Sequence, residues 1–107
     1  MKLNLIYVAV FCIAASTVTP AFAQNAGADT YKAKCAMCHG ADGLGNTPAG
    51  KNLKAASFKD PALVKAPDAQ LIAAVKHGKG NMKASVSASL TDAQIKDVIA
   101  YVRTLQK

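Results

Sequence analysis

The stretch CAMCHG, residues 35–40, places two cysteines and a histidine side by side in a chain that is otherwise rich in alanine and lysine. Three kinds of site use such a cluster: a metal centre, a thiol–disulfide pair, or the anchor of a covalently attached group. Each kind needs different residues elsewhere in the chain. The surrounding sequence therefore decides which of them this stretch can form.

The start of the chain has the features of a secretory signal peptide. Lys2 supplies a positive charge, an apolar block follows over residues 5–18, and Ala-Phe-Ala stands at 21–23. The block is shorter than the roughly 20 apolar residues that cross a bilayer, and small residues at this spacing precede a cleavage site. We expect removal of residues 1–23; a retained membrane anchor is the alternative. Residues 24–107 then form one domain in the periplasm or an equivalent extracytoplasmic compartment.

Removal of this segment changes the composition of the protein. Cys12 leaves with it, so that Cys35 and Cys38 are the remaining cysteines. The loss of Lys2 lowers the formal net charge of +7 by one, which still favours anionic partners. Nucleic acid is a poor partner for an exported chain with dispersed lysines. A domain this small also gains stability from a bound cofactor.

Three main helices are predicted, and no segment favours a strand. The helix over residues 91–107 is the clearest, because Thr91 and Gln94 form a capping box and Asp92 suits the positive end of the helix dipole. Its apolar face repeats at helical spacing and consists of Ile95, Val98, Ile99, Val102 and Leu105. The predicted fold class is therefore all-α.

The other two main helices run from about residue 28 into CAMCH and over residues 68–77. A short helix is expected around residues 60–65, and long loops are expected at 40–57 and 78–89. One face of the first helix carries an aromatic ring and both thiols: Tyr31, Cys35 and Cys38.

A zinc centre or a redox-active thiol pair would lack its other parts. A structural zinc site needs four ligands, commonly from two separated pairs, but His77 is the one further cysteine or histidine of the mature chain. Cys38 and His39 are adjacent, so they point in different directions on a helix and chelate one ion poorly. A thioredoxin-like pair belongs near a βαβ pattern, and no strands are predicted.

The sequence C-x-x-C-H is the attachment signature of c-type haem. The thiols of Cys35 and Cys38 share one helical face, so each can add to one of two neighbouring vinyl groups. His39 then comes up beneath the iron and offers a ring nitrogen as one axial ligand. Export agrees with this interpretation, because c-type haem is attached outside the cytoplasm. We predict one covalent haem c, with its iron, as the cofactor.

The second axial ligand is sought among the remaining methionines and histidines. Met37 lies inside the attachment motif on the His39 side of the ring and cannot reach the opposite face. Met82 lies in a glycine-flanked loop, far enough along the chain to fold back over the ring. A thioether is a haem ligand that raises the reduction potential. We expect Met82 to ligate the iron, and His77 or an open site is the alternative.

These residues resemble class I c-type cytochromes, the small mono-haem electron carriers, over nearly all of the mature chain. Gly27-x-x-x-Tyr31-x-x-x-Cys35 resembles the N-terminal helix of that family, and VIAYVRTL at 98–105 resembles its C-terminal helix. The resemblance implies that the two helices cross with Gly27 close to the Tyr101 region. The sequence CHGADGLGN is most similar to the short bacterial and algal type named cytochrome c6, c551 and c553.

The chain departs from the family in two places. Members often have Gly-Pro-x-Leu after the attachment site, and the proline carbonyl accepts a hydrogen bond from the ligand histidine. The nearest match here is GKNL at residues 50–53, so the resemblance implies that the Lys51 carbonyl accepts this bond from His39. The ligand methionine is often followed by proline, whereas Lys83 follows Met82 here.

A haem with both axial positions filled leaves no room for a substrate, so we expect a one-electron carrier and not an enzyme. Its expected partners are redox proteins with acidic docking surfaces, which Lys76, Lys79 and Lys83 would steer toward the Met82 side. We expect a monomer whose mature chain has no stable membrane insertion. The alternatives are a haem subunit of a larger oxidoreductase complex, or an open-site haem protein that binds or reduces a small ligand.

Overall fold

The computed structural model describes residues 20–107, and it describes their side chains from residue 25 onward. The predicted signal peptide therefore lies almost wholly outside the described residues. No helix within residues 20–107 is long and apolar enough to cross a membrane.

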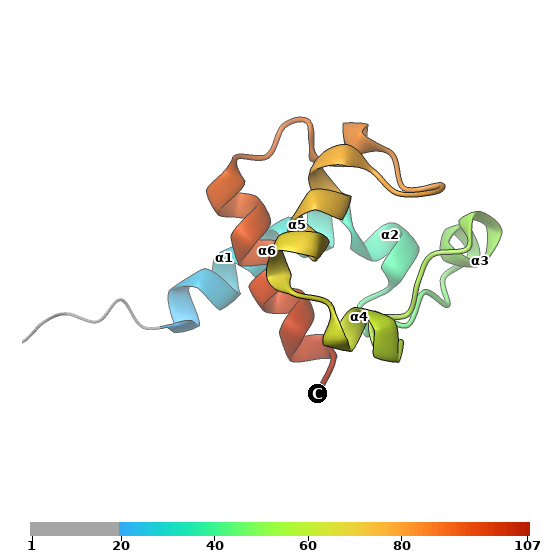
Figure 1. The fold of residues 1–107 in the computed structure, drawn as a ribbon, viewed down its shortest axis with the longest axis horizontal. Helices are drawn as coiled ribbons and strands as arrows, with labels where there is room; N and C mark the ends of the chain where they lie inside the picture. Colours follow the sequence, from blue (N-terminus) through green and yellow to red (C-terminus); the bar gives the residue numbers. More distant parts are fainter. Residues whose placement is uncertain (1–19) are drawn as a thin grey trace, which may run out of the picture.

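The described chain forms helices and no strand, apart from an isolated bridge between Lys79 and Met82. The elements, drawn in Figure 1, are α1 (Pro20–Lys34), α2 (Ala36–His39), α3 (Pro48–Leu53), α4 (Pro61–Lys65), α5 (Asp68–His77), the 3-10 helix η1 (Ala84–Ser87) and α6 (Asp92–Leu105). The predicted all-α class is confirmed. Helices α4, α5 and α6 lie where the sequence predicts them, whereas α1 begins earlier, at Pro20.

Helices α1 and α6 form the main helix pair of the fold and cross each other in Figure 1. Gly27 lies at the crossing: a Cβ atom there would overlap the carbonyl oxygen of Asp97 and stand 3.2 Å from the Cβ of Tyr101. A residue without a Cβ allows the two backbones to approach this closely. The contact between Gly27 and the Tyr101 region, implied by the family resemblance, is confirmed.

The buried core lies between this helix pair and the chain that follows it. Tyr31, Val98 and Val102 form its centre, and the side chain of Tyr31 is 1% exposed. The Tyr31 ring packs against the rings of Tyr101 and Phe58, with centroids 5.2 Å and 6.1 Å away. These aromatic contacts join α1 both to α6 and to the segment around residue 58.

Helix α6 begins with the predicted capping box. The hydroxyl of Thr91 accepts a hydrogen bond from the Gln94 N–H at 3.2 Å, and the Gln94 side-chain oxygen accepts one from the Thr91 N–H at 2.8 Å. Two donors at the helix N-terminus are thereby satisfied. The predicted apolar face supplies the four buried residues of this helix: Ile95, Val98, Ile99 and Val102.

Helix α3 forms inside the segment predicted to be a loop, and Thr47 is the reason. Its hydroxyl accepts a hydrogen bond from the Gly50 N–H at 2.9 Å and lies 2.6 Å and 3.0 Å from the carbonyl oxygens of Met37 and Cys38. Pro48 follows at the first helical position, where a missing N–H costs nothing. The prediction of an uninterrupted loop over 40–57 is therefore wrong, and Thr47 ties α3 to the end of α2.

Candidate functional site

Helix α2 and the residue before it carry the two cysteines: Cys35 is the N-cap of α2 and Cys38 lies within it. The Cys35 N–H donates to the Tyr31 carbonyl at 2.8 Å, so the chain passes from α1 into α2 almost without a break. Both thiols are free and half-buried. Burial, and then the neighbouring Cys38, raises the pKa of the Cys35 thiol to about 11, so this sulfur is protonated at neutral pH. Two free thiols three residues apart fit the two attachment points of a c-type haem.

The imidazole of His39 is fixed on two sides. Its Nδ1 lies 3.1 Å from the carbonyl oxygen of Ala56, and because a carbonyl can only accept, we assign the ring proton to Nδ1. The ring of Phe58 stacks on it, with centroids 4.5 Å apart and planes 22° from parallel. Burial lowers the pKa of His39, and the hydrogen bond to Ala56 opposes this effect only in part. The lowered pKa favours the neutral ring. The lone pair of Nε2 then faces no hydrogen-bond partner within the described residues, as an iron ligand requires.

The backbone partner of His39 is not the predicted one. The resemblance placed the Lys51 carbonyl in this role, but the bond goes to Ala56, and Lys51 lies inside α3. The Lys51 prediction is therefore wrong. The physical reason is helix α3, which takes up residues 48–53 and leaves the later sequence AASF, residues 55–58, to pass the imidazole.

Phe58 is a site residue that the sequence analysis missed. Its ring contacts the rings of both His39 and Tyr31, and its N–H donates to the Gly43 carbonyl at 2.9 Å. The bond to Gly43 holds the segment against the turn that follows α2. One feature of the sequence could have indicated it: Phe58 is the one phenylalanine, tyrosine or tryptophan between Tyr31 and Tyr101.

Met82 lies in a tight turn between α5 and η1. Its N–H donates to the Lys79 carbonyl at 3.0 Å, and the Lys79 N–H donates to the Met82 carbonyl at 2.9 Å. Gly78 and Gly80 adopt φ values of 81° and 58°, which favour glycine. The Met82 side chain is half-buried, and its sulfur accepts no hydrogen bond within the described residues.

The turn that carries Met82 is attached to α3. The side-chain amide of Asn81 donates to the Leu53 carbonyl at 2.9 Å, across 28 positions of sequence. Figure 1 shows this turn and α3 on the same side of the α1–α6 pair as α2. The structure thus brings Cys35, Cys38 and His39 together on one segment and places Met82 on another, with no hydrogen bond between the two segments in the part of the chain that is described.

The remaining residues named by the sequence lie near the C-terminus of α5. His77, the alternative ligand, is exposed in the last turn of this helix. Lys76 forms an ion pair with Asp92 at 3.0 Å. Lys79 and Lys83 are exposed and form no ion pair within the described residues.

Comparison with known proteins agrees with this arrangement. The structure is similar to a solved structure named KustC0563 c-type cytochrome, with a TM-score of 0.67 and 30% identity over 76% of this chain and 98% of that one. No curated protein matches the chain. The fold and the CAMCH segment are those of a small class I-like c-type cytochrome. Residues 22–102 match the family described as cytochrome c oxidase, cbb3-type, subunit III, and since they make up more than half of the chain, the protein belongs to that family.

Membership of this family establishes the cofactor as covalently bound haem c with its iron. The residues around the CAMCH segment fit this group. Helix α2 and its N-cap Cys35 offer two free thiols, and next to them an imidazole whose Nε2 is unpaired within the described residues. Proteins of this class generally carry electrons.

Proposed function

We propose that the protein is an extracytoplasmic one-electron carrier, with haem attached through Cys35 and Cys38 and iron ligated by His39 and Met82. The observation that carries the proposal is the orientation of His39. Its Nδ1 is held by Ala56, while its Nε2 is left free beside two free thiols. When bound, the haem supplies an iron that takes up and releases one electron.

The chain's own residues give this site its properties. The Ala56 carbonyl and the Phe58 ring fix the plane of the imidazole, and the hydrogen bond that Nδ1–H donates to Ala56 makes Nε2 a stronger electron-pair donor to iron. The thioether of Met82 would close the opposite axial position and raise the reduction potential. With both positions filled by protein, the iron has no room for a substrate, so the protein is a carrier and not an enzyme.

The features of residues 1–23 support the proposed location. A positive start, an apolar block and an Ala-x-Ala ending direct a chain to the export machinery. Cleavage after Ala23 would leave residues 24–107 as a free domain. This domain would act as a monomer outside the cytoplasm, where c-type haem is attached.

Exposed lysines beside Met82 support redox partners with an acidic docking surface. Lys79 and Lys83 have no carboxylate within ion-pair distance in the described residues, so their charge is free to attract a partner. Lys76 contributes less, because Asp92 partly neutralises it. Such charges raise the rate of encounter, and salt screens them.

The end of α3 would extend this docking surface. Its Leu53 accepts the hydrogen bond from Asn81 and is 47% exposed. Lys51 and Lys54 on either side of it are exposed as well. An apolar centre with a charged rim is the usual composition of a transient protein interface.

A second candidate function is that of a haem subunit in a larger oxidoreductase complex. The observation in its favour is the family match, since the description of that family names a subunit of an oxidase. Purification of the native protein without detergent separates the two candidates. A free carrier is recovered alone, whereas a subunit is recovered with its complex.

Absorption spectra of the holoprotein and of Met82→Ala test the ligand assignment. The ferric holoprotein should show the weak band at the red end of the visible spectrum that marks methionine–iron ligation, and Met82→Ala should lose it and have a lower reduction potential. Met37→Leu is the matched control, because Met37 is 78% exposed on α2 and should leave both readouts unchanged. A band that is absent from the wild type, or that survives in Met82→Ala, would reject Met82 and favour His77 or an open site.

A further inference from the structure

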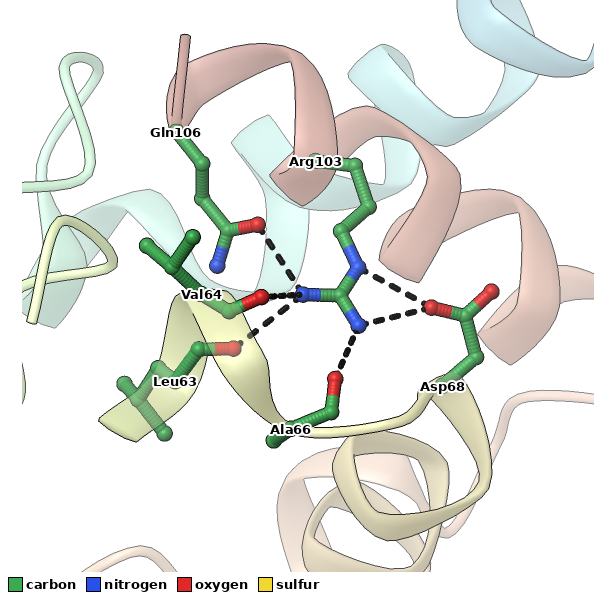
Figure 2. A network of polar contacts seen from close by, with 6 residues as sticks. All are labelled: Leu63, Val64, Ala66, Asp68, Arg103 and Gln106. Carbon is green, nitrogen blue, oxygen red and sulfur yellow. Dashed lines mark hydrogen bonds and ion pairs between the residues drawn. The ribbon is translucent and has the colours of Figure 1, made fainter. Parts of the chain in front are cut away.

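The guanidinium of Arg103 holds the junction between α4 and α5. Its Nη1 donates to the carbonyls of Leu63 and Val64 at 3.1 Å and 3.4 Å, and its Nη2 donates to the carbonyl of Ala66. Both Nε and Nη2 lie 2.9 Å from the Asp68 carboxylate. Figure 2 shows the side chain reaching from α6 into the centre of these groups.

These partners lie at the end of α4 and at the start of α5. Leu63 and Val64 belong to the last turn of α4, whose carbonyls lack a following helical turn to donate to them. The Leu63 carbonyl also accepts a 3.2 Å hydrogen bond from the Ala66 N–H, so Arg103 adds to this cap. Asp68 is the first residue of α5, and the preceding Pro67 provides no side-chain cap. The planar fork of an arginine can satisfy several acceptors at once, which a lysine ammonium cannot do in the same geometry. Arg103 therefore fixes the start of α5 relative to α6.

The opposite end of α5 leads directly into the turn that carries Met82. Gly78 ends the helix with a 2.9 Å hydrogen bond from its N–H to the Ala74 carbonyl. The buried hydroxyl of Ser87 donates to the Val75 carbonyl at 2.7 Å and so attaches η1, on the far side of the turn, to the same helix. Helix α5 thus connects the residues held by Arg103 at its start with the Met82 turn at its end.

The side chains of α5 do not fix its position by themselves, since none of them is fully buried and Leu71, Ile72 and Val75 are half-buried. A shift at one end of a ten-residue helix is transmitted to the other end, because a helix is stiff over this length. The polar anchors at the two ends of α5, together with the Asn81–Leu53 hydrogen bond, therefore set where the Met82 turn lies.

We propose that Arg103 is a positioning residue for the iron site: by anchoring the start of α5, it keeps the turn at residues 78–83 closed over the haem. The inference rests on the proposed ligation by Met82. Arg103 itself touches neither Met82 nor the attachment motif through any hydrogen bond in the described chain, so its effect acts through α5.

The first test compares Arg103→Gln with the wild type during unfolding of the ferric holoprotein in guanidinium. The methionine–iron band reports the Met82 turn, and the far-UV circular dichroism reports the helices. We expect the band to disappear at lower denaturant than the helix signal, with a wider gap between the two midpoints than in the wild type. The matched control is Lys96→Gln, which removes one charge from the same helix at an exposed position without an ion pair in the described residues. An unchanged gap in Arg103→Gln would overturn the proposal.

The second test measures the affinity of the ferric holoprotein for added imidazole. An added ligand binds only when the Met82 turn is open, so its apparent affinity is proportional to the open fraction. Loss of charged hydrogen bonds at the junction should raise that affinity on the order of tenfold in Arg103→Gln. Arg103→Lys should give a smaller increase, and it carries the test if Arg103→Gln fails to fold. An affinity equal to that of the wild type in every folded Arg103 variant would show that the residue supports stability alone.

Failure of this inference is distinguishable from failure of the ligand assignment. If Met82 is not the ligand, the wild type lacks the red band and Met82→Ala binds imidazole as the wild type does. If only the role of Arg103 is wrong, the wild type has the band, Met82→Ala binds imidazole more tightly, and the Arg103 variants do not.

Discussion

The hydroxyl of Tyr31 donates a 2.6 Å hydrogen bond to the carbonyl oxygen of Gly40, nine positions along the chain. Tyr31 lies in the centre of the core on α1, and Gly40 is the residue at which the chain leaves α2, with a φ of 81°. The bond therefore spans the whole attachment motif. It fixes the end of α2, and with it His39, to the α1–α6 pair.

Replacement of Tyr31 by phenylalanine should lower the free energy of unfolding by about 0.5–1.5 kcal/mol, the usual net value of one hydrogen bond. The effect stays in this range because the Gly40 carbonyl keeps a second, 3.2 Å hydrogen bond from the Gly43 N–H. Guanidinium unfolding of the holoprotein measures the change. Tyr101→Phe is the matched control, since the Tyr101 hydroxyl makes no hydrogen bond in the described residues, and it should change stability by less than about 0.5 kcal/mol.

The same tyrosine should make stability depend on alkaline pH. Burial, with smaller contributions from the neighbouring Cys35, Tyr101 and Asp42, raises the pKa of Tyr31 far above its usual range. The folded protein thus holds this proton more tightly than the unfolded chain, whose tyrosines titrate near about 10. The stabilisation is fully present below that pH and is lost above it, at up to about 1.4 kcal/mol per pH unit. The free energy of unfolding, measured at about pH 9 and at about pH 11, should therefore fall more in the wild type than in Tyr31→Phe. Equal falls in the two proteins would contradict this prediction.

Gly27→Ala should destabilise the protein although alanine favours helices. A Cβ at this position meets the backbone of Asp97, which no side-chain rotation can relieve, and overpacking of this kind costs about 1–3 kcal/mol. The propensity gain of about 0.5–1 kcal/mol offsets only part of that cost. Ala33→Gly, at an exposed site of the same helix, is the opposite exchange and should also destabilise, by about 1 kcal/mol. A Gly27→Ala protein that unfolds at higher denaturant than the wild type would refute the close crossing.

Neutralisation of Lys79 and Lys83 to glutamine should slow electron transfer to an acidic redox partner and reduce its salt dependence. The two charges lie beside the proposed Met82 ligand, where steering acts on the productive encounter. Rates measured over a range of ionic strength test this. The control is Lys96→Gln with Lys107→Gln, which removes equal charge from α6 and the chain end. If both pairs have the same effect, net charge alone matters and the docking surface is wrongly placed.

Cys35→Ser combined with Cys38→Ser should lose most of the helical circular dichroism signal. A domain of this size has a small core, and a covalently held cofactor supplies much of the apolar surface that it packs around. Cys12→Ser changes a cysteine in the predicted signal peptide and should keep both haem and helix content. A well-folded double variant would show that the helices need no cofactor.

The elements that the sequence predicted correctly are those with local signals. The Thr91–Gln94 capping box and the apolar repeat of α6 involve residues close together in the sequence, so they can be recognised without knowledge of the fold. Gly27 and Tyr101 were paired through the family resemblance, which supplied the one long-range contact. The attachment motif is also local, because its two thiols and its imidazole occupy five consecutive positions.

Two features that could not be predicted from the sequence, the partner of His39 and the role of Arg103, depend on backbone atoms. Any residue offers a carbonyl, so nothing in the side chain of Ala56 marks it as the partner of His39. Its position follows from α3, which the Thr47 cap creates by contacts with α2. Arg103 was equally hidden, since three of its acceptors are main-chain carbonyls from more than 35 positions earlier in the sequence. Such roles emerge only from the folded arrangement.

The pairing of α1 with α6 also has a consequence for the order in which the protein can be assembled. Helix α1 ends at Lys34 and its main partner begins only at Asp92, so a chain that is still short of α6 lacks the main surface against which α1 packs. A contact between such distant segments must close a long loop, which slows its formation relative to local contacts. During that interval the CAMCH motif stays on an open chain. The machinery that attaches haem would therefore meet the motif before α6 packs beside Cys35.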